Sequence, residues 1–223
     1  MKRFLQIGIV WYFALFAGEQ ALAQRSAPWV GESFDGAPCR GGGQGFGPFD
    51  YLQRGGLKQQ LYLVESAHFT PEVEQLARGN TGALTGDLDY TLRAWPNHHR
   101  ALNAMNRYQL RSGASTVSAM RRANIPPAEC YLLRAVNFSP KDDMAYMLLG
   151  LLSHRKDRHE EALTAYRKAV ELSPSNIQAK YNLALLLVDL GQLKEAEALA
   201  ADVYAAGFPL QGLKRKLSAH DSQ

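Results

Sequence analysis

The six histidines are the residues of this 223-residue chain best suited to holding a metal ion. A helical zinc site needs two histidines four residues apart on one face. His98 and His99 are adjacent, so on a helix they point about 100° apart, and His154 and His159 are five apart across a predicted turn. These spacings favour solvated or helix-capping histidines, and we expect neither a metal nor another cofactor.

Other catalytic patterns are also unmatched. No serine lies in a Gly-x-Ser-x-Gly elbow, and neither cysteine has a histidine nearby in the sequence. The glycine run at 41–47 lacks the Lys-Ser/Thr ending that a phosphate-binding loop needs. The paired carboxylates Asp142-Asp143 and Glu160-Glu161 fall at predicted helix starts, where they favour the positive end of the helix dipole. We therefore predict a protein that is not an enzyme.

The first 23 residues have the composition of a secretory signal peptide. Lys2-Arg3 is followed by an apolar stretch to Phe16 and by small residues up to Ala23. The alternative is an uncleaved membrane anchor, but the apolar run is shorter than the about 20 residues that span a bilayer. We expect cleavage after Ala23, export to the periplasm or beyond, and no membrane-spanning segment in the mature chain.

The mature chain carries a weak positive charge. The whole chain has 25 Lys and Arg against 21 Asp and Glu, and loss of Lys2, Arg3 and Glu19 leaves 23 and 20, a net charge of +3. A charge this small and dispersed does not predict nucleic-acid binding. The one dense basic run, at 214–216, is expected on the solvated side of a last helix.

Two cysteines in an exported chain permit one disulfide bond. Cys39 lies in a predicted loop, and Cys130 lies 91 residues later in a predicted helix. A bond between them would stabilise the fold by about 3–4 kcal/mol, because it closes a long loop. The alternative is a buried thiol at Cys130 and a free thiol at Cys39.

Three prolines indicate how the chain is organised. Pro140 and Pro174 are 34 residues apart, and Pro96 precedes Pro140 by 44. The residues five, ten and seventeen positions after the prolines are Ala101, Ala145 and Ala179, then Asn106, Gly150 and Ala184, then Gly113, Asp157 and Gly191. A 34-residue period with small residues at fixed offsets predicts stacked helical hairpins.

The middle unit, 141–174, resembles the tetratricopeptide repeat (TPR) family. Tyr146 takes the place of the usual Trp, and the other matching positions are Leu149, Gly150, Ala162, Tyr166, Ala169 and Pro174. The flanking units, 97–140 and 175–208, match less closely, since Asn106 stands where Gly or Ala is expected and Pro209 comes one residue late. The first unit also holds ten extra residues between Gly113 and Ala128, which we interpret as a long loop between its two helices.

The resemblance implies an all-α solenoid of three to four TPR-like hairpins, and the alternative is an ordinary helical bundle. The Gly- and Pro-rich N-terminal segment, 24–68, is expected to be irregular and to pack in part on the solenoid through its aromatic residues. Within it, residues 57–69 fit either a strand or a helix.

Both ends of the repeat array are expected to carry helices. Thr70-Pro71-Glu72 predicts a helix to about Arg78, and a second helix from Asp87 would complete a degenerate pair over 69–96. In the segment 209–223, leucines 210, 213 and 217 have helical spacing, which predicts a capping helix over the end of the stack.

The resemblance also implies a ligand surface. In TPR proteins the first helix of each pair lines a concave groove, and its positions 2, 5, 6, 9, 12 and 13 make most ligand contacts. In this sequence those positions hold Arg100, Asn103, Arg107 and Arg111, then Met144, Met147, Leu151, His154 and Arg155, then Gln178, Tyr181, Asn182, Leu185 and Asp189. The arginines predict a clamp for a carboxylate, and the Met and Tyr residues predict a place for an apolar side chain. The alternative is that the arginines are solvated and the apolar residues pack on neighbouring helices.

We therefore interpret the chain as a non-enzymatic adaptor of the cell envelope, whose partner is a protein or peptide with an acidic segment. The alternative is an accessory subunit of an envelope enzyme or transporter, which would act through the loop at 24–56 or the insertion at 114–125.

Overall fold

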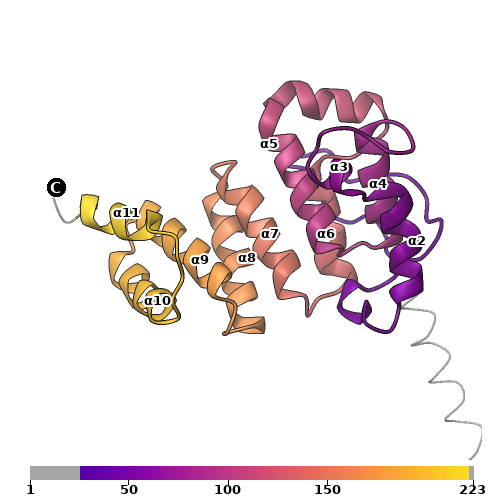
Figure 1. The fold of residues 1–223 in the computed structure, drawn as a ribbon. Coiled ribbons are helices and arrows are strands. Elements are labelled where there is room, and N and C mark those ends of the chain that lie inside the picture. Colours follow the sequence, from indigo (N-terminus) through magenta and orange to yellow (C-terminus); the bar gives the residue numbers. More distant parts are fainter. Residues whose placement is uncertain (1–25, 221–223) are drawn as a thin grey trace, which may run out of the picture.

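The computed structural model describes residues 26–220 as a curved stack of helices (Figure 1). The predicted signal peptide lies outside the described residues. The helices are η1 (Tyr51–Gln53), α2 (Lys58–His68), α3 (Pro71–Glu74), α4 (Leu84–Ala94), α5 (His99–Arg122), α6 (Ala128–Phe138), α7 (Asp143–His154), α8 (His159–Leu172), α9 (Ile177–Asp189), α10 (Leu193–Ala205) and α11 (Gly212–His220). Across 26–220 the β pairing is limited to one isolated bridge, Glu32–Pro38. The predicted all-α solenoid is confirmed.

The first helix of each repeat begins with the same kind of side-chain N-cap. The residue two positions after each of the three prolines caps the helix, accepting a hydrogen bond from the backbone N–H three residues on. The caps are His98 of α5, Asp142 of α7 and Asn176 of α9, with donor–acceptor distances of 3.2, 3.2 and 2.9 Å. Such a cap contributes about 1 kcal/mol. Because each cap lies two residues after its proline, the proline spacing also sets where α5, α7 and α9 begin.

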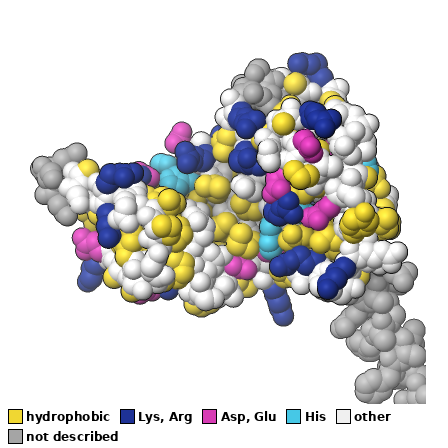
Figure 2. Space-filling view, in the orientation of Figure 1, with side chains coloured by type: hydrophobic (Ala, Val, Ile, Leu, Met, Phe, Trp, Pro, Cys, Tyr) yellow, Lys and Arg dark blue, Asp and Glu magenta, His cyan; other side chains and the backbone are white. Residues whose placement is uncertain are grey.

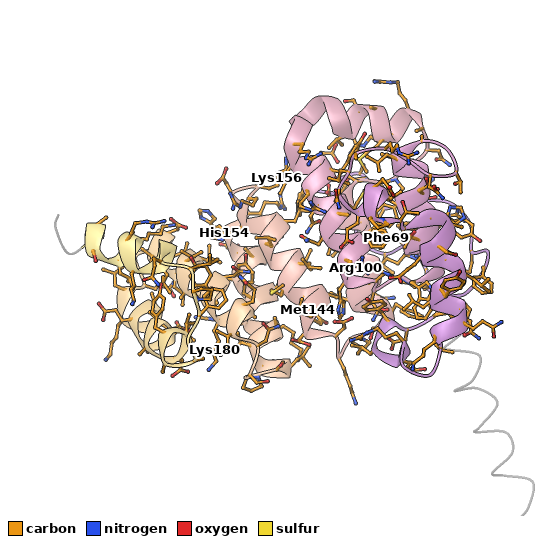
Figure 3. All side chains as sticks on the ribbon, viewed as in Figure 1. Phe69, Arg100, Met144, His154, Lys156 and Lys180 are labelled. Atoms are coloured by element: carbon orange, nitrogen blue, oxygen red, sulfur yellow. A yellow bond between two sulfur atoms is a disulfide. The ribbon has the colours of Figure 1, made fainter. Side chains whose placement is uncertain are left out.

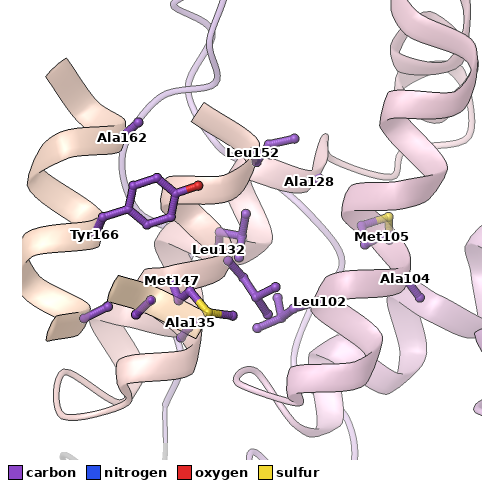
Figure 4. Packing of buried hydrophobic residues seen from close by; sticks show 14 of the residues in the cluster. Leu102, Ala104, Met105, Ala128, Leu132, Ala135, Met147, Leu152, Ala162 and Tyr166 are labelled. Atoms are coloured by element: carbon purple, nitrogen blue, oxygen red, sulfur yellow. The ribbon is translucent and has the colours of Figure 1, made fainter. Parts of the chain in front are cut away.

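Helices α7 and α8 show why the repeat needs small residues at fixed places. A Cβ on Gly150 of α7 would lie 2.5 Å from the Tyr166 ring of α8, so only glycine fits there. Tyr166 and Ala162 are fully buried in this contact, as Figure 4 shows. The hairpin turns at Asp157 with φ +57°, and the next hairpin turns at Gly191 with φ +70°, a backbone region that ends many helices.

The ten extra residues of the first unit do not form the predicted loop. They extend α5, which continues past Gly113 to Arg122, and the left-handed residue that ends it is Asn124, with φ +55°. Ten residues add nearly three turns, and a helix keeps its backbone groups hydrogen-bonded where a loop would not. The extension is held by Met120, which is 1% exposed. The insertion at 114–125 named in the accessory-subunit alternative is thus mostly an extension of α5.

The N-terminal end of the stack also differs from the prediction. The segment 57–69, which fitted either a strand or a helix, forms α2, which packs on α4. The helix predicted from Thr70 to Arg78 is only the single turn α3, because Leu76 adopts φ +61° and breaks it. The first helical pair is therefore α2 with α4.

Residues 26–50, the N-terminal strap, run across α6. A disulfide joins Cys39 of the strap to Cys130 of α6. Arg134 of α6 donates to the carbonyls of Ala27 and Leu92 at 2.6 and 2.7 Å, and its guanidinium lies 4.8 Å from the centre of the Trp29 ring. The aromatic packing predicted for this segment is therefore present.

Helix α11 closes the far end of the stack. Leu213 is fully buried against α9 and α10, as the leucine spacing predicts, whereas Leu210 precedes the helix and is 52% exposed. Within 26–220, no helix combines the length and the apolar character needed to cross a bilayer.

Candidate peptide-binding groove

A cavity of about 1060 Å³ lies on the concave side of the stack, along α5, α7, α9 and α11. Its floor is apolar and comes mainly from α7: Met144, Met147, Leu148, Leu151 and, from α9, Leu185. Figure 2 shows this hollow with hydrophobic side chains in its middle and charged side chains toward its edges. We call it the concave groove.

The groove contains most of the residues predicted from the sequence. These are Arg100, Asn103, Met144, Met147, Leu151, His154, Arg155, Gln178, Tyr181, Asn182, Leu185 and Asp189. Arg107 and Arg111, which were predicted beside them, do not line the cavity. Arg107 instead donates a hydrogen bond to the backbone carbonyl of Glu74.

The predicted basic end of the groove is neutralised by the chain itself. The Arg100 Nε donates to Glu74 at 2.8 Å, and the Arg100 Nη1 lies 3.4 Å from a carboxylate oxygen of Glu65. The hydrogen bond from Arg100 lowers the pKa of Glu74, and the hydrogen bond to Glu74 raises the pKa of Arg100. Figure 3 shows Arg100 beside Phe69, over whose ring its guanidinium lies. This arginine is therefore not free to clamp a ligand carboxylate in the way the sequence suggested.

Asp142 fixes α5 against α7 beneath the same end of the groove. Its carboxylate is fully buried and accepts a hydrogen bond from Asn97 at 2.7 Å and from the His99 Nε2 at 2.9 Å. The same carboxylate caps α7. One side chain thus sets the spacing of two helices that line the groove.

A second charged cluster joins the other end of α7 to α9 and α11. The His154 Nε2 lies 3.0 Å from Asp189, and Lys216 of α11 pairs with the second oxygen of the same carboxylate. Partial burial alone would raise the pKa of Asp189, but the hydrogen bonds from Lys216 and His154 outweigh it and hold that pKa below its usual value. Burial lowers the pKa of His154, against the opposing effect of Asp189.

The wall formed by α9 presents amide groups. The Gln178 Nε2 donates to the Asn182 Oδ1 at 3.0 Å, and the Asn182 Nδ2 has no partner within the described part of the chain. Tyr181 packs its ring 4.7 Å from the ring of Phe208. This side of the groove can therefore hydrogen-bond a peptide backbone beside the apolar floor.

Several lining residues were not predicted. Leu148 follows Met144 by four residues and shares its face, so helical spacing could have found it. Nothing in the sequence indicated that the groove would include His99, Tyr166 and Lys216. The position of His99 depends on its hydrogen bond to Asp142, that of Tyr166 on its packing over Gly150, and that of Lys216 on the docking of α11.

A second cavity of about 1060 Å³ lies on the opposite side of α7, along α8 and the strap. It is lined by Tyr146 and Leu149, which point away from Met144 and Met147 because a helix turns 100° per residue. Its rim charges pair with one another, Arg158 with Glu161 at 2.6 Å and Lys168 with Glu171 at 2.7 Å. The concave groove is the stronger candidate, since the first helices of all three repeats build it.

Residues 154–191 match the family model described as TPR repeat, so the TPR resemblance is supported over the end of α7, α8 and α9. Over 62 residues, or 28% of this chain, the sequence is 40% identical to a peroxisomal targeting signal receptor of Kluyveromyces lactis, of which it covers 11%. Over 92 residues, or 41% of this chain, it is 34% identical to the human protein O-mannosyl-transferase TMTC1, of which it covers 10%. The chain thus spans about a tenth of the length of the curated relatives it matches.

A solved structure of MamA (41-end) from Desulfovibrio magneticus RS-1 is similar over 69% of this chain and 78% of that chain. The TM-score is 0.44 and the sequence identity is 22%.

Proposed function

We propose that the chain is a non-enzymatic protein–protein interaction scaffold whose concave groove binds an extended peptide segment of a partner protein. The observation that carries this proposal is the groove itself, an open cavity of about 1060 Å³ with an apolar floor and, on one wall, the Asn182 amide, whose Nδ2 has no partner among the described residues. An extended peptide needs both features, since its side chains alternate and its backbone groups need partners.

The ligand segment is expected to carry an acidic side chain beside its apolar ones. The TPR match over residues 154–191 supports an interaction role, because stacked helical repeats commonly use their concave surface for binding. A targeting signal receptor among the matched proteins is also consistent with peptide recognition.

A charge placed on the groove floor tests this function. Leu151→Glu and Leu185→Glu are expected to abolish capture of the partner, because each places a carboxylate where an apolar ligand side chain would lie. Both leucines are half-buried, so circular dichroism must first show that each variant folds.

The matched control is Leu63→Glu, since Leu63 lies on α2 outside the groove and is 52% exposed. The readout is quantitative mass spectrometry of proteins captured from envelope extract. Equal recovery of the same proteins by all three variants and the wild type would refute groove binding.

We also propose that the chain acts outside the cytoplasm. The basic-apolar-small pattern of residues 1–23 supports export, and so does the disulfide, a bond that persists mainly in oxidising compartments. Fractionation of the native host followed by N-terminal sequencing tests this. The expected result is a chain in the envelope fraction that starts at Gln24, and a cytoplasmic chain with an intact N-terminus would contradict it.

A further inference from the structure

Three arginine or lysine side chains of the described part line the concave groove, and two of them are paired within the chain. Arg100 is held by Glu65 and Glu74. Lys216 is held by Asp189. The third is Arg155, which ends α7, is exposed and lies on the groove wall. Among residues 26–220, no carboxylate pairs with it.

Tyr166 also lines the groove, and its hydroxyl is buried with its hydrogen bond unmade. Tyr166 is fully buried, and its Oη has no hydrogen-bond partner among the described residues. Buried hydroxyls without a partner are uncommon, because such a group loses its hydrogen bonds to water. Burial raises the pKa of this hydroxyl, and the charge of Arg155 acts on it in the opposite direction. The charge of Arg155 therefore acts on the Tyr166 hydroxyl.

The charged neighbours of Arg155 do not pair with it. His154 is engaged with Asp189 at 3.0 Å. Asp157 lines the same stretch of wall, but its side chain is 95% exposed and its nearest basic partner is His159, 4.0 Å away. Figure 3 shows His154 at the end of α7 nearest α11, so the cluster lies well along the groove from Arg100.

We propose that Arg155 binds the side-chain carboxylate of an aspartate or glutamate in the bound peptide. This inference rests on the proposed peptide-binding function of the groove. The cavity continues past Arg155 to Leu210 and Lys216 on one side and to Asn103 on the other. A peptide backbone can therefore run past this point, so that a side chain rather than a chain end reaches Arg155. The sequence predicted that Arg100, Arg107 and Arg111 would bind the acidic side chain. The residue proposed here, Arg155, lies at the opposite end of α7.

The probe is a random 12-residue phage-displayed library selected on residues 24–223, followed by synthesis of enriched peptides with both ends blocked. Each peptide is made in an acidic form and in a form with Asn or Gln in place of its acid. Dissociation constants are measured by fluorescence anisotropy for the wild type, Arg155→Gln, Tyr166→Phe and Leu151→Glu. Arg111→Gln is the matched control, because Arg111 is an exposed arginine outside the groove.

The expected result is that Arg155→Gln weakens binding of the acidic peptide about tenfold, as loss of a charge-assisted hydrogen bond does. The same variant should bind the amide form as well as the wild type does. Tyr166→Phe, whose lost hydroxyl is buried, and Arg111→Gln should both leave binding of the acidic peptide unchanged.

Two sets of results separate the inference from the function on which it rests. If Leu151→Glu abolishes binding but Arg155→Gln leaves the preference for the acid intact, the inference is wrong and groove binding stands. The inference is equally wrong if Arg111→Gln removes the preference, or if blocking the C-terminus of the peptide abolishes binding. If no peptide is enriched, or if Leu151→Glu binds normally, the groove function fails and the inference fails with it.

Discussion

Tyr166 connects the packing of a repeat with the groove. Its ring fills the space over Gly150, and the residue also lines the groove. Its hydroxyl is buried. The absence of a side chain at Gly150 therefore positions one residue of the groove lining.

Gly150→Ala is expected to destabilise the fold by about 1–3 kcal/mol, because the added Cβ would lie 2.5 Å from the Tyr166 ring. The control is Gly86→Ala in α4, where a Cβ meets nothing within 4 Å. That change should be neutral or should stabilise by up to about 1 kcal/mol through helix propensity. Chemical denaturation measures both, and equal stability of the two variants would contradict the close packing.

His98 is a buried titratable group at the start of α5. Its Nδ1 accepts from the backbone N–H of Ala101, so the proton of the neutral ring is on Nε2, which donates to Glu65 at 2.9 Å. Burial lowers the pKa of His98, although the hydrogen bond to Glu65 opposes this, and Arg100 and His99 also disfavour the charged ring. The unfolded chain therefore takes up a proton at His98 at a higher pH than the folded chain does.

The free energy of unfolding is accordingly expected to fall as the pH drops below about 6.5, the ordinary pKa of histidine, toward the lower folded value. His98→Asn removes the titrating ring but keeps an N-cap, as Asn176 does in α9. The fall in Tm between pH 7 and pH 5 should be smaller in this variant. His159→Asn, at a half-exposed site, is the control. An unchanged pH dependence in His98→Asn would show that another group is responsible.

At the scale of elements, the strap is held by the disulfide and by several hydrogen bonds, among them those of Arg134. Burial lowers the pKa of Arg134 to about 10, and much of its lost hydration is replaced by the carbonyls of Ala27 and Leu92 and by the Gln44 side chain at 2.8 Å. If the strap detached from α6, Arg134 and the ring of Trp29 would both return to water.

Reduction of the disulfide is expected to lower the free energy of unfolding by about 2–4 kcal/mol and to speed tryptic cleavage after Arg40, which is exposed in the strap. Peptide mass spectrometry follows the cut with and without reductant. The double variant Cys39→Ser, Cys130→Ser should be cut quickly in both conditions. If reductant leaves the rate in the wild type unchanged, the disulfide does not hold the strap in place.

The elements that the sequence predicted well are those whose signals are local. The N-caps and prolines define where α5, α7 and α9 begin, and Gly150 and Gly191 mark contacts or turns inside single hairpins. The sequence did not predict the extension of α5, because Gly113 matches the position of a turn in the other units. Whether a chain turns or continues there depends on packing further along, at Met120.

The candidate site was predictable in its apolar part but not in its charges. Met144, Met147 and Leu185 follow from the positions that the TPR resemblance assigns to the groove. Arg100 is lost as a ligand group because it pairs with the side chains of Glu65 and Glu74, and Arg107 because it donates to the backbone carbonyl of Glu74. Glu65 and Glu74 lie in α2 and α3, which are not part of the repeats. Contacts between distant segments cannot be read from spacing within one helix, so it took the fold to show that Arg155 has no carboxylate partner among residues 26–220.

For the whole molecule, the curved stack gives α7 two exposed sides, with the concave groove on one and the second cavity on the other. Figure 1 shows the helices following one another along the curve, so a partner held in the groove would touch several repeats at once. Recognition spread over several repeats is typical of such solenoids.

Site-specific photo-crosslinking in living cells tests the groove most directly. A benzophenone amino acid is placed at Asn103, exposed in the concave groove, or at Thr164, exposed beside the second cavity. The account predicts that the Asn103 position yields a discrete crosslinked polypeptide which disappears when Leu151→Glu is added, and that the Thr164 position yields none. Crosslinking of the partner from Thr164 but not from Asn103 would contradict it.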